Sequence, residues 1–427
     1  MKQYFPASVS DRATDYVVVI LMENENYYDI LGNPTAAPFI NHLADDFGLA
    51  SSYYDVSSNL SLPNYLGVTA GQTYSSWSSC NKPPQQCSGF VPIISPTIVD
   101  SIEDSGLIWK AYMEDMPSDC YQNDSGLYVA RHDPFVYFSR VLTTPSECNL
   151  VVPAGTNASR MISDLASTTT ASNFMWLTPN LCNDMHDCPV STGDKYLSLL
   201  IPQILNSPVF QTQKAALFLT WDEGWGSNSA HVPAIWAGPS IRNNFTSTTR
   251  HDHYSLLKTL ETVWHLAPLT SNDAAASPMT EFFRGPEISF IYAPSQPQTY
   301  QTITFQATAE GGTLPYVYNW NFGDREIATG TTTSHGYETA GSYRVTLSVI
   351  DALNNTAAAS ETVNLSTTNP LPPSSDSTEP TLPNWLLNTG PLSIITTSAI
   401  ITFIIGVSMM KLVDRNTRWK RNRIRER

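Results

Sequence analysis

Residues 15–22 read DYVVVILM, and every side chain after Tyr16 in this run is apolar. A continuous β-branched and apolar run is typical of a strand in a parallel sheet, because helices cover both faces of such a strand. Glu23 and Asn24 follow directly. Since ligands bind beyond the carboxyl ends of the strands in open α/β sheets, these two residues stand where chemistry is expected.

The same pattern recurs through residues 1–285. Further apolar runs that end in polar loops are GLIWKAYMED (106–115), ASNFMWLTPN (171–180), KAALFLTWDEG (214–224) and HVPAIWAGP (231–239). Segments with helical spacing are APFINHLADDFG (37–48), TGDKYLSLLIPQILNS (192–207) and HYSLLKTLETVWHL (253–266). This alternation predicts an α/β domain with a mostly parallel sheet flanked by helices over residues 1–285.

Residues 286–367 have a different pattern. Alternating segments such as GSYRVTLSVIDA (341–352) are joined by Gly and Asn turns, which predicts a small β-sandwich. Residues 368–390 are rich in Pro, Ser and Thr, a composition that indicates an extended stalk.

Residues 391–413 form an apolar run whose single charge, Lys411, lies near its end. This length is enough for a helix to cross a bilayer, and a buried core helix fits a terminal run with basic flanks less well. The basic tail 414–427 follows. The positive-inside rule therefore predicts a single-pass protein of the cell membrane, with the C-terminus in the cytoplasm and the α/β domain extracellular.

The net charge is −15, although the segment from Lys411 onward holds eight Lys and Arg against two acidic residues. The rest of the chain is therefore strongly acidic. Such a surface argues against nucleic-acid binding, which depends on Lys and Arg to neutralise phosphates.

The cysteines support an extracellular location. Six are present, without the spacing of a zinc site, and an even number outside the cytoplasm favours disulfides. Cys80–Cys87 and Cys182–Cys188 are plausible short loops, but the sequence leaves the connectivity open. Exposed glycosylation sites are expected at Asn123, Asn157, Asn244, Asn354 and Asn364.

Four strand ends deliver carboxylate, amide or imidazole groups, the ligands of hard and borderline divalent metals. These residues are Glu23, Asn24, Asn180, Asp184, His186, Asp222, Glu223 and His253. Each has an ordinary alternative as a helix cap, a solvated turn or a loop residue. Their recurrence at four strand ends of one domain favours a metal site.

Ser61 lies in NLSLPNYLGVTAG (59–71). Ser and Pro are common where helices begin, so Ser61 can be an ordinary helix-start residue. It can also be a nucleophile, because a neighbouring metal lowers the pKa of a serine hydroxyl and a helix N-terminus attracts anions.

Six motifs in order resemble the phosphoesterase family, which contains acid phosphatases and phospholipase C-like enzymes and belongs to the alkaline-phosphatase superfamily. The motifs are VVVILMENENYYDILGN (17–33), SLPNYLGVTAG (61–71), RHDPFVYF (131–138), LTPNLCNDMHDC (177–188), TWDEG (220–224) and HYSLLKTLE (253–261). The resemblance implies an alkaline-phosphatase-like fold.

The resemblance also implies roles for individual residues. Ser61 would be the nucleophile that forms a phosphoserine intermediate, and His253 or His186 would protonate the leaving group. The implied metal ligands are Glu23, Asn24, Asp222 and Glu223, and the implied substrate contacts are Asn64, Arg131, His132, Asn180 and Asp184. The family's second-metal pattern Asp-x-x-x-His appears here as Asn180-x-x-x-Asp184, so one divalent ion is expected, with a second site in doubt.

Residues 320–324 (WNFGD) and 334–351 resemble a PKD-type domain, which implies a spacer or a site of cell-surface contacts, with Trp320 in its core. The chain is thus expected to be an extracellular, metal-dependent phosphomonoesterase of the acid-phosphatase type. The alternatives are a phospholipase C-type phosphodiesterase and a non-catalytic surface adhesion protein.

Overall fold

The computed structural model describes residues 12–57, 60–225 and 230–367. An eight-stranded sheet has the strand order β5-β4-β6-β1-β7-β8-β2-β9. Its strands are β1 (Tyr16–Met22), β2 (Gly48–Ala50), β4 (Trp109–Met113), β5 (Val151–Pro153), β6 (Phe174–Thr178), β7 (Ala215–Trp221), β8 (Ala234–Ala237) and β9 (Phe245–Ser247). Strand β8 is antiparallel to β7 and β2, and the other neighbouring pairs are parallel.

Strand β1 lies at the centre of this sheet, as the apolar run 15–22 predicts. Residues 17–22 are fully buried, because β6 and β7 flank the strand in parallel and helices cover its faces. In the register of β1 and β7, Met22 lies opposite Trp221. The residues that follow the two strands therefore leave the sheet side by side.

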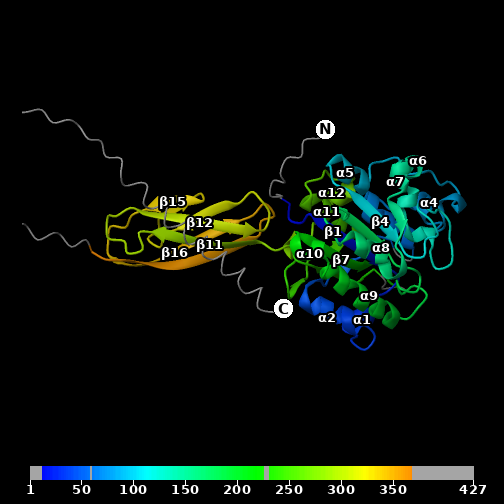
Figure 1. The fold of residues 1–427 in the computed structure, drawn as a ribbon, viewed down its shortest axis with the longest axis horizontal. Coiled ribbons are helices and arrows are strands. Elements are labelled where there is room, and N and C mark those ends of the chain that lie inside the picture. Colours follow the sequence, from blue (N-terminus) through cyan, green and yellow to red (C-terminus); the bar gives the residue numbers. More distant parts are fainter. Residues whose placement is uncertain (1–11, 58–59, 226–229, 368–427) are drawn as a thin grey trace, which may run out of the picture. The chain divides into compact units, whose positions relative to one another are not determined.

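Helices lie on both sides of the sheet (Figure 1), with α5 and α11 on one side and α2 and α9 on the other. The predicted helices correspond to α2, α9 and α11. The helices are α1 (Tyr27–Ile30), α2 (Pro38–Asp46), α3 (Ser61–Ala70), α4 (Ser75–Ser78), α5 (Ile98–Asp104), α6 (Ser139–Thr143), α7 (Pro145–Cys148), α8 (Ser159–Asp164), α9 (Val190–Leu205), α10 (Pro208–Thr212), α11 (His253–Val263) and α12 (Ser271–Ala275).

The predicted mostly parallel α/β architecture is confirmed. Strands β2, β5 and β9 were not predicted, because three residues are too few for a hydrophobic pattern to show. A separate two-stranded parallel sheet pairs β3 (Tyr53–Tyr54) with β10 (His251–Asp252).

Residues 286–365 form the predicted β-sandwich with its own hydrophobic core. One sheet holds β11 (Pro286–Ala293), β12 (Ile303–Gly311) and β15 (Thr332–His335). The other holds β14 (Ile327–Thr329), β13 (Val317–Asn321), β16 (Gly341–Ile350) and β17 (Thr356–Leu365). Trp320 is buried in this core, as expected, and its indole nitrogen donates to the Gly330 carbonyl at 2.9 Å.

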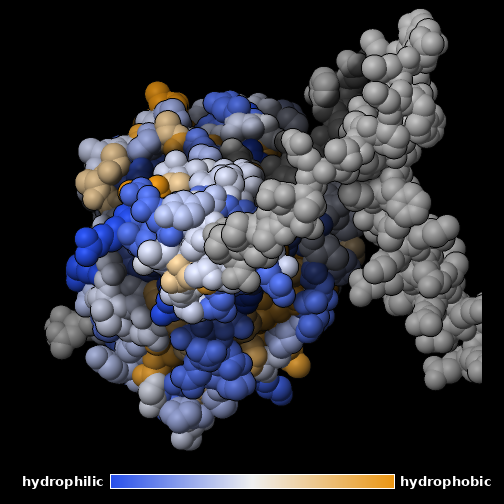
Figure 2. Space-filling model, turned by 90° about the vertical axis from the view of Figure 1, so that its left-hand side faces the viewer, coloured by the Kyte–Doolittle hydropathy of each residue, from blue (hydrophilic) through white to orange (hydrophobic). Residues whose placement is uncertain are grey.

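All six cysteines are paired. The bridges are Cys80–Cys87, Cys120–Cys148 and Cys182–Cys188, so both short loops predicted from the sequence are confirmed. The five Asn-x-Ser/Thr asparagines considered above are exposed. The face drawn in Figure 2 is mainly hydrophilic, with hydrophobic residues in small separate groups.

Within residues 12–57, 60–225 and 230–367, no helix has both the length and the apolar character needed to cross a membrane. The predicted stalk 368–390, membrane span 391–413 and basic tail 414–427 lie outside the described residues. They remain predictions.

Candidate active site

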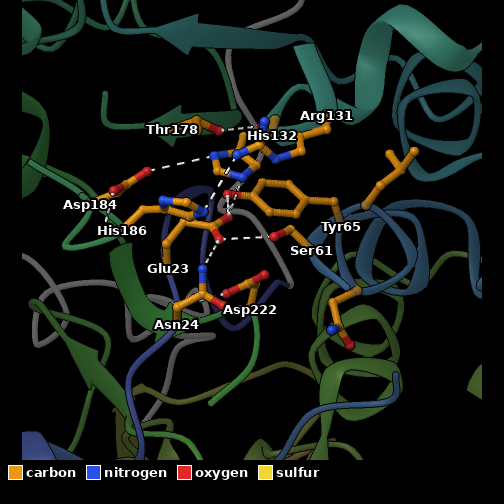
Figure 3. A network of polar contacts seen from close by, with 12 residues as sticks. Glu23, Asn24, Ser61, Tyr65, Arg131, His132, Thr178, Asp184, His186 and Asp222 are labelled. Carbon is orange, nitrogen blue, oxygen red and sulfur yellow. Dashed lines mark hydrogen bonds and ion pairs between the residues drawn. The ribbon is translucent and has the colours of Figure 1, made fainter. Parts of the chain in front are cut away.

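The ends of β1 and β7 bring together residues that are almost 200 positions apart in the sequence. Glu23 and Asn24 follow β1, and Asp222 follows β7 (Figure 3). The backbone amide of Asn24 donates to Asp222 Oδ1 at 3.1 Å. This hydrogen bond joins the segments that follow β1 and β7. This contact confirms that the polar residues after the two strands meet at one edge of the sheet.

Glu23 is the hub of the cluster and is fully buried. Its Oε1 accepts a hydrogen bond from the Tyr65 hydroxyl at 2.7 Å and lies 3.2 Å from His132 Nε2. Its Oε2 accepts from the Ser61 hydroxyl at 3.0 Å and from the Asn24 side-chain amide at 3.2 Å. Four side chains therefore converge on one carboxylate, two of them from α3 (Figure 3).

Helix α3 brings Ser61 to this hub. Ser61 is the first residue of the helix and is buried, as are all other residues of α3. The helix ends at Gly71, whose φ of 66° is left-handed and whose amide donates to the Gly67 carbonyl. Because a helix N-terminus favours anions, the position of Ser61 suits a phosphate ester.

The loop after β6 adds a carboxylate and a histidine. The Cys182–Cys188 bridge closes this loop, and the Glu23 amide donates to the Asp184 carbonyl at 2.9 Å. Asp184 Oδ1 accepts from the His186 amide at 2.8 Å, while its Oδ2 lies 3.6 Å from a ring nitrogen of His132. The backbone hydrogen bond therefore holds the disulfide-closed loop against the end of β1.

His186 has the orientation of a ligand held by a carboxylate. Its Nδ1 lies 2.7 Å from Asp187 Oδ1, and its Nε2 lies 3.4 Å from an Arg131 nitrogen. Histidines that bind metals commonly donate their other ring nitrogen to a carboxylate, which fixes the tautomer.

Burial dominates the electrostatics of the cluster. It raises the pKa of Glu23 and of Asp184 well above their usual range, and it raises the pKa of Asp222 to about 7. The neighbouring Asp222 and Asp184 charges raise the pKa of Glu23 further. Burial lowers the pKa of His132, and the Arg131 charge adds to this effect. The neutral forms are favoured because the effect of burial exceeds that of the Arg131 charge, which lowers the pKa of Asp184.

The residues present fit a divalent cation. Among the residues that the structure describes, Asp222 Oδ2, Asp184 Oδ2 and His132 Nε2 are buried without a hydrogen-bond partner, although His132 Nε2 lies 3.2 Å from Glu23 Oε1. One ligand atom each from Glu23, His132 and His186 lies within 4.8 Å of the others. Oxygen and imidazole ligands of this kind bind borderline divalent metals. His132, predicted as a substrate contact, thus groups with the ligand-type residues.

The side chains of Asn64 and Asn180 make hydrogen bonds within the protein, and their role as substrate contacts stays a prediction. The Asn64 carbonyl oxygen accepts from the amides of Val56 and Ser57, and its NH₂ group donates to the carbonyls of Ser57 and Leu60. Asn180 Oδ1 accepts from two amides of its own loop, and its NH₂ group donates to an Asp115 carboxylate. Both amides hold backbone loops beside the cluster.

The contacts of His253 are those of a positioning residue, and its role as the acid for the leaving group stays a prediction. It is fully buried, its Nε2 donates to the Asp222 carbonyl at 2.6 Å, and its Nδ1 accepts from the Tyr53 hydroxyl at 3.0 Å. Burial lowers its pKa to about 4. Both ring nitrogens are engaged, so His253 positions the residue that carries the Asp222 carboxylate.

Glu223, a predicted metal ligand, contacts the residue that precedes α3. Its Oε2 accepts from the Leu60 amide, which belongs to the residue before Ser61. The segment that follows β7 therefore holds the backbone at the start of α3.

Tyr65 is a functional residue that the sequence analysis missed. Its hydroxyl donates to Glu23, and its ring is stacked on His132 with centroids 5.5 Å apart and an angle of 4° between planes. The spacing of four residues from Ser61 was the available signal, because residues i and i+4 share one face of a helix.

Comparison with known proteins shows which families the two domains resemble. The model of the Phosphoesterase family matches residues 26–267, more than half of the chain. The chain belongs to the Phosphoesterase family. A PKD domain model matches residues 284–367, where the β-sandwich lies.

The relatives are phosphatases by name. A phosphatidylinositol-3-phosphatase of Mycobacterium tuberculosis is 29% identical over 63% of this chain and 82% of its own length. A phosphate-repressible acid phosphatase of Penicillium chrysogenum is 27% identical over 64% of this chain, and the match spans only 65% of that relative. A solved protein in the alkaline phosphatase superfamily from Vibrio parahaemolyticus matches with 12% identity and a TM-score of 0.44, covering 76% of this chain and 82% of its own.

Replacing Asn64 tests its structural role. In Asn64→Ala the partly buried Val56 and Ser57 amides lose their acceptor, so we expect a loss of about 2 kcal/mol in the free energy of unfolding, measured by urea denaturation. Asn64→Asp retains the acceptor and should lose less. An unchanged stability of Asn64→Ala with a raised KM would instead make Asn64 a substrate contact.

Removing the Tyr65 hydroxyl should weaken metal binding. Tyr65→Phe deletes a donor to Glu23, and loss of a group that orients a ligand typically costs about tenfold or more in affinity. The measurement is zinc and manganese titration by calorimetry. Tyr112→Phe, which deletes a buried hydroxyl bonded to Asp164, is the matched control and should bind normally. Equal affinities of both variants would contradict the role of Tyr65.

Stabilisation by metal should increase with pH. The folded-state pKa of Asp222, about 7, lies above the unfolded value of about 4, so protonation stabilises the metal-free fold at low pH. This contribution is fully present below the unfolded pKa and is lost as pH rises through 7. A cation requires the ionised carboxylates. We expect a larger difference in Tm between metal-loaded and metal-stripped protein at about pH 7.5 than at about pH 5.5. A difference that does not vary with pH would contradict the site.

Proposed function

We propose that this protein is a metal-dependent phosphoric ester hydrolase, an acid-phosphatase-like monoesterase that uses Ser61 as its nucleophile. One observation carries the proposal: the Ser61 hydroxyl, at the N-terminus of α3, donates to a Glu23 carboxylate that belongs to the cluster of ligand-type residues. A hydroxyl beside such a cluster is placed for attack on phosphorus. Family membership and the names of the relatives support the same class of reaction.

The covalent steps follow from the contacts of Ser61. Its Oγ attacks phosphorus while its proton passes to the ionised Glu23 at Oε2, 3.0 Å away. The bond between phosphorus and the ester oxygen breaks, and this oxygen takes a proton from His186 or from water as the alcohol leaves. Water then attacks the phosphoserine, the bond from Oγ to phosphorus breaks, inorganic phosphate is released and Oγ takes its proton back from Glu23. A divalent cation would supply neutralisation of the phosphoryl charge and a lower pKa for the serine hydroxyl.

The proposal also assigns roles to Arg131 and His186, which lie beside the cluster. The Arg131 guanidinium suits the equatorial phosphoryl oxygens, where charge is stabilised during transfer. His186 is partly exposed, so it can exchange protons with solvent and serve the leaving group. Its Nε2 also lies with the ligand-type atoms of Glu23 and His132. Both roles use this nitrogen, so His186 can perform only one of them.

We also propose that the enzyme acts outside the cytoplasm. Three disulfides support this location, because disulfides persist mainly in oxidising compartments. The exposed Asn-x-Ser/Thr sites are compatible with glycosylation there. In this scheme the PKD domain separates the hydrolase from the predicted membrane anchor at 391–413 and is available for cell-surface contacts.

Substitution of Ser61 tests the mechanism. Ser61→Ala should lower kcat for p-nitrophenyl phosphate by about a thousandfold or more, because no nucleophile remains. Ser271→Ala removes another helix-start serine, from α12, and should leave kcat unchanged. Ser61→Ala with full activity would exclude the phosphoserine route.

The same assay separates the alternatives. A monoesterase should prefer p-nitrophenyl phosphate to bis(p-nitrophenyl) phosphate, whereas a phospholipase C-type enzyme should prefer the diester. Phosphatidylinositol 3-phosphate belongs in the substrate panel because of the M. tuberculosis relative. Absence of hydrolysis of every ester with every divalent metal would favour the adhesion protein.

A further inference from the structure

The chain segments that leave β1 and β7 carry exposed aromatic residues immediately after the ligand-type residues. Tyr28 follows Glu23 and Asn24 and is 76% exposed, and Trp225 follows Glu223 and is 58% exposed. The Trp225 amide donates to the Asn26 side-chain oxygen at 3.2 Å. The two segments therefore stay linked beyond the cluster.

A stack of rings supports these exposed residues. The Tyr27 ring lies 4.2 Å from the His231 ring at an interplanar angle of 11°, and the His231 ring lies 5.0 Å from the Tyr54 ring at 22°. The Arg250 guanidinium lies 3.8 Å over the Tyr54 ring. The Tyr28 ring packs edge-on against Tyr27 at 5.1 Å. We call these residues the aromatic rim: Tyr27, Tyr28, Tyr54, Trp225 and His231.

A single exposed aromatic side chain needs no explanation, but the aromatic rim differs in its location. Trp225 is two residues from Glu223, so their Cα atoms are at most about 7 Å apart. Tyr28 is four residues from Asn24, which allows at most about 14 Å. The Glu223 carboxylate accepts a hydrogen bond from the amide of Leu60, the residue before Ser61, so the segment that carries Trp225 begins beside the proposed nucleophile.

We propose that the aromatic rim binds the leaving group of the substrate, and that the preferred substrates are phosphate monoesters whose leaving group carries a planar ring. The inference rests on the proposed function and adds its substrate class. Aromatic faces bind flat rings by offset or edge-on stacking. The ring stack and the Asn26–Trp225 hydrogen bond hold the aromatic rim in shape before the substrate binds, which reduces the entropy lost on binding.

The test measures binding with ligands that cannot be hydrolysed. Benzylphosphonate carries a ring at the position of an aryl ester, and ethylphosphonate has the same phosphonate group without a ring. Calorimetry with the purified full chain should show that benzylphosphonate binds about tenfold more tightly, within the range measured for one aromatic stacking contact.

Variants then locate this preference. The ratio of the affinity for benzylphosphonate to the affinity for ethylphosphonate should fall to about one in Trp225→Ala or in Tyr28→Ala, while the affinity for ethylphosphonate stays unchanged. Tyr300→Ala, which removes a tyrosine of the β-sandwich region that is also 76% exposed, is the matched control and should retain the preference. Trp225→Phe keeps a ring and should retain most of it.

Three results would contradict the proposed role of the aromatic rim. Equal affinity for the two ligands in the wild type, no binding of either, or a preference that survives both alanine variants would overturn the inference. Failure of the proposed function would appear separately, as absence of hydrolysis of every phosphate ester by the wild type. The phosphonate titration needs no turnover, so it decides the role of the aromatic rim in either case.

Discussion

The burial of several carboxylates beside one another is the constraint on which the rest of this structure depends. Glu23, Asp184 and Asp222 are fully buried at the edge of the sheet, and Glu223 is nearly so. An uncompensated buried charge costs several kcal/mol, so such groups must either stay protonated or share a cation. The fold maintains this arrangement through the parallel register of β1 and β7 and through the disulfide that closes the loop of Asp184.

The hydrogen bonds around this cluster hold its residues in position. Asn64 holds the backbone that leads to α3, Glu223 holds the residue before Ser61, and His253 holds the Asp222 carbonyl. Because Ser61 and Tyr65 donate to opposite oxygens of Glu23, one helix sets both the nucleophile and the orientation of the hub. Catalysis of phosphoryl transfer depends mainly on the positions of the reacting groups and on electrostatics. In this site, hydrogen bonds fix those positions.

Hydrophobic pattern was sufficient to predict the architecture and the edge of the sheet where the site lies. Glu23 and Asp222 were found because they directly follow strands whose apolar runs are unmistakable. The individual roles of Asn64, Asn180 and His253 stay predictions, because residue type does not reveal which backbone groups occupy a side chain. The Cys120–Cys148 bridge joins residues whose proximity depends on the tertiary fold, so sequence left it open.

The central claim is that the buried carboxylates hold a divalent cation beside Ser61. Anomalous diffraction from crystals of the active protein tests it most directly. We expect a metal peak within coordination distance of Glu23 and Asp222, together with loss of the peak and of activity after chelation. Full activity in a protein that has no metal at this position would contradict the account.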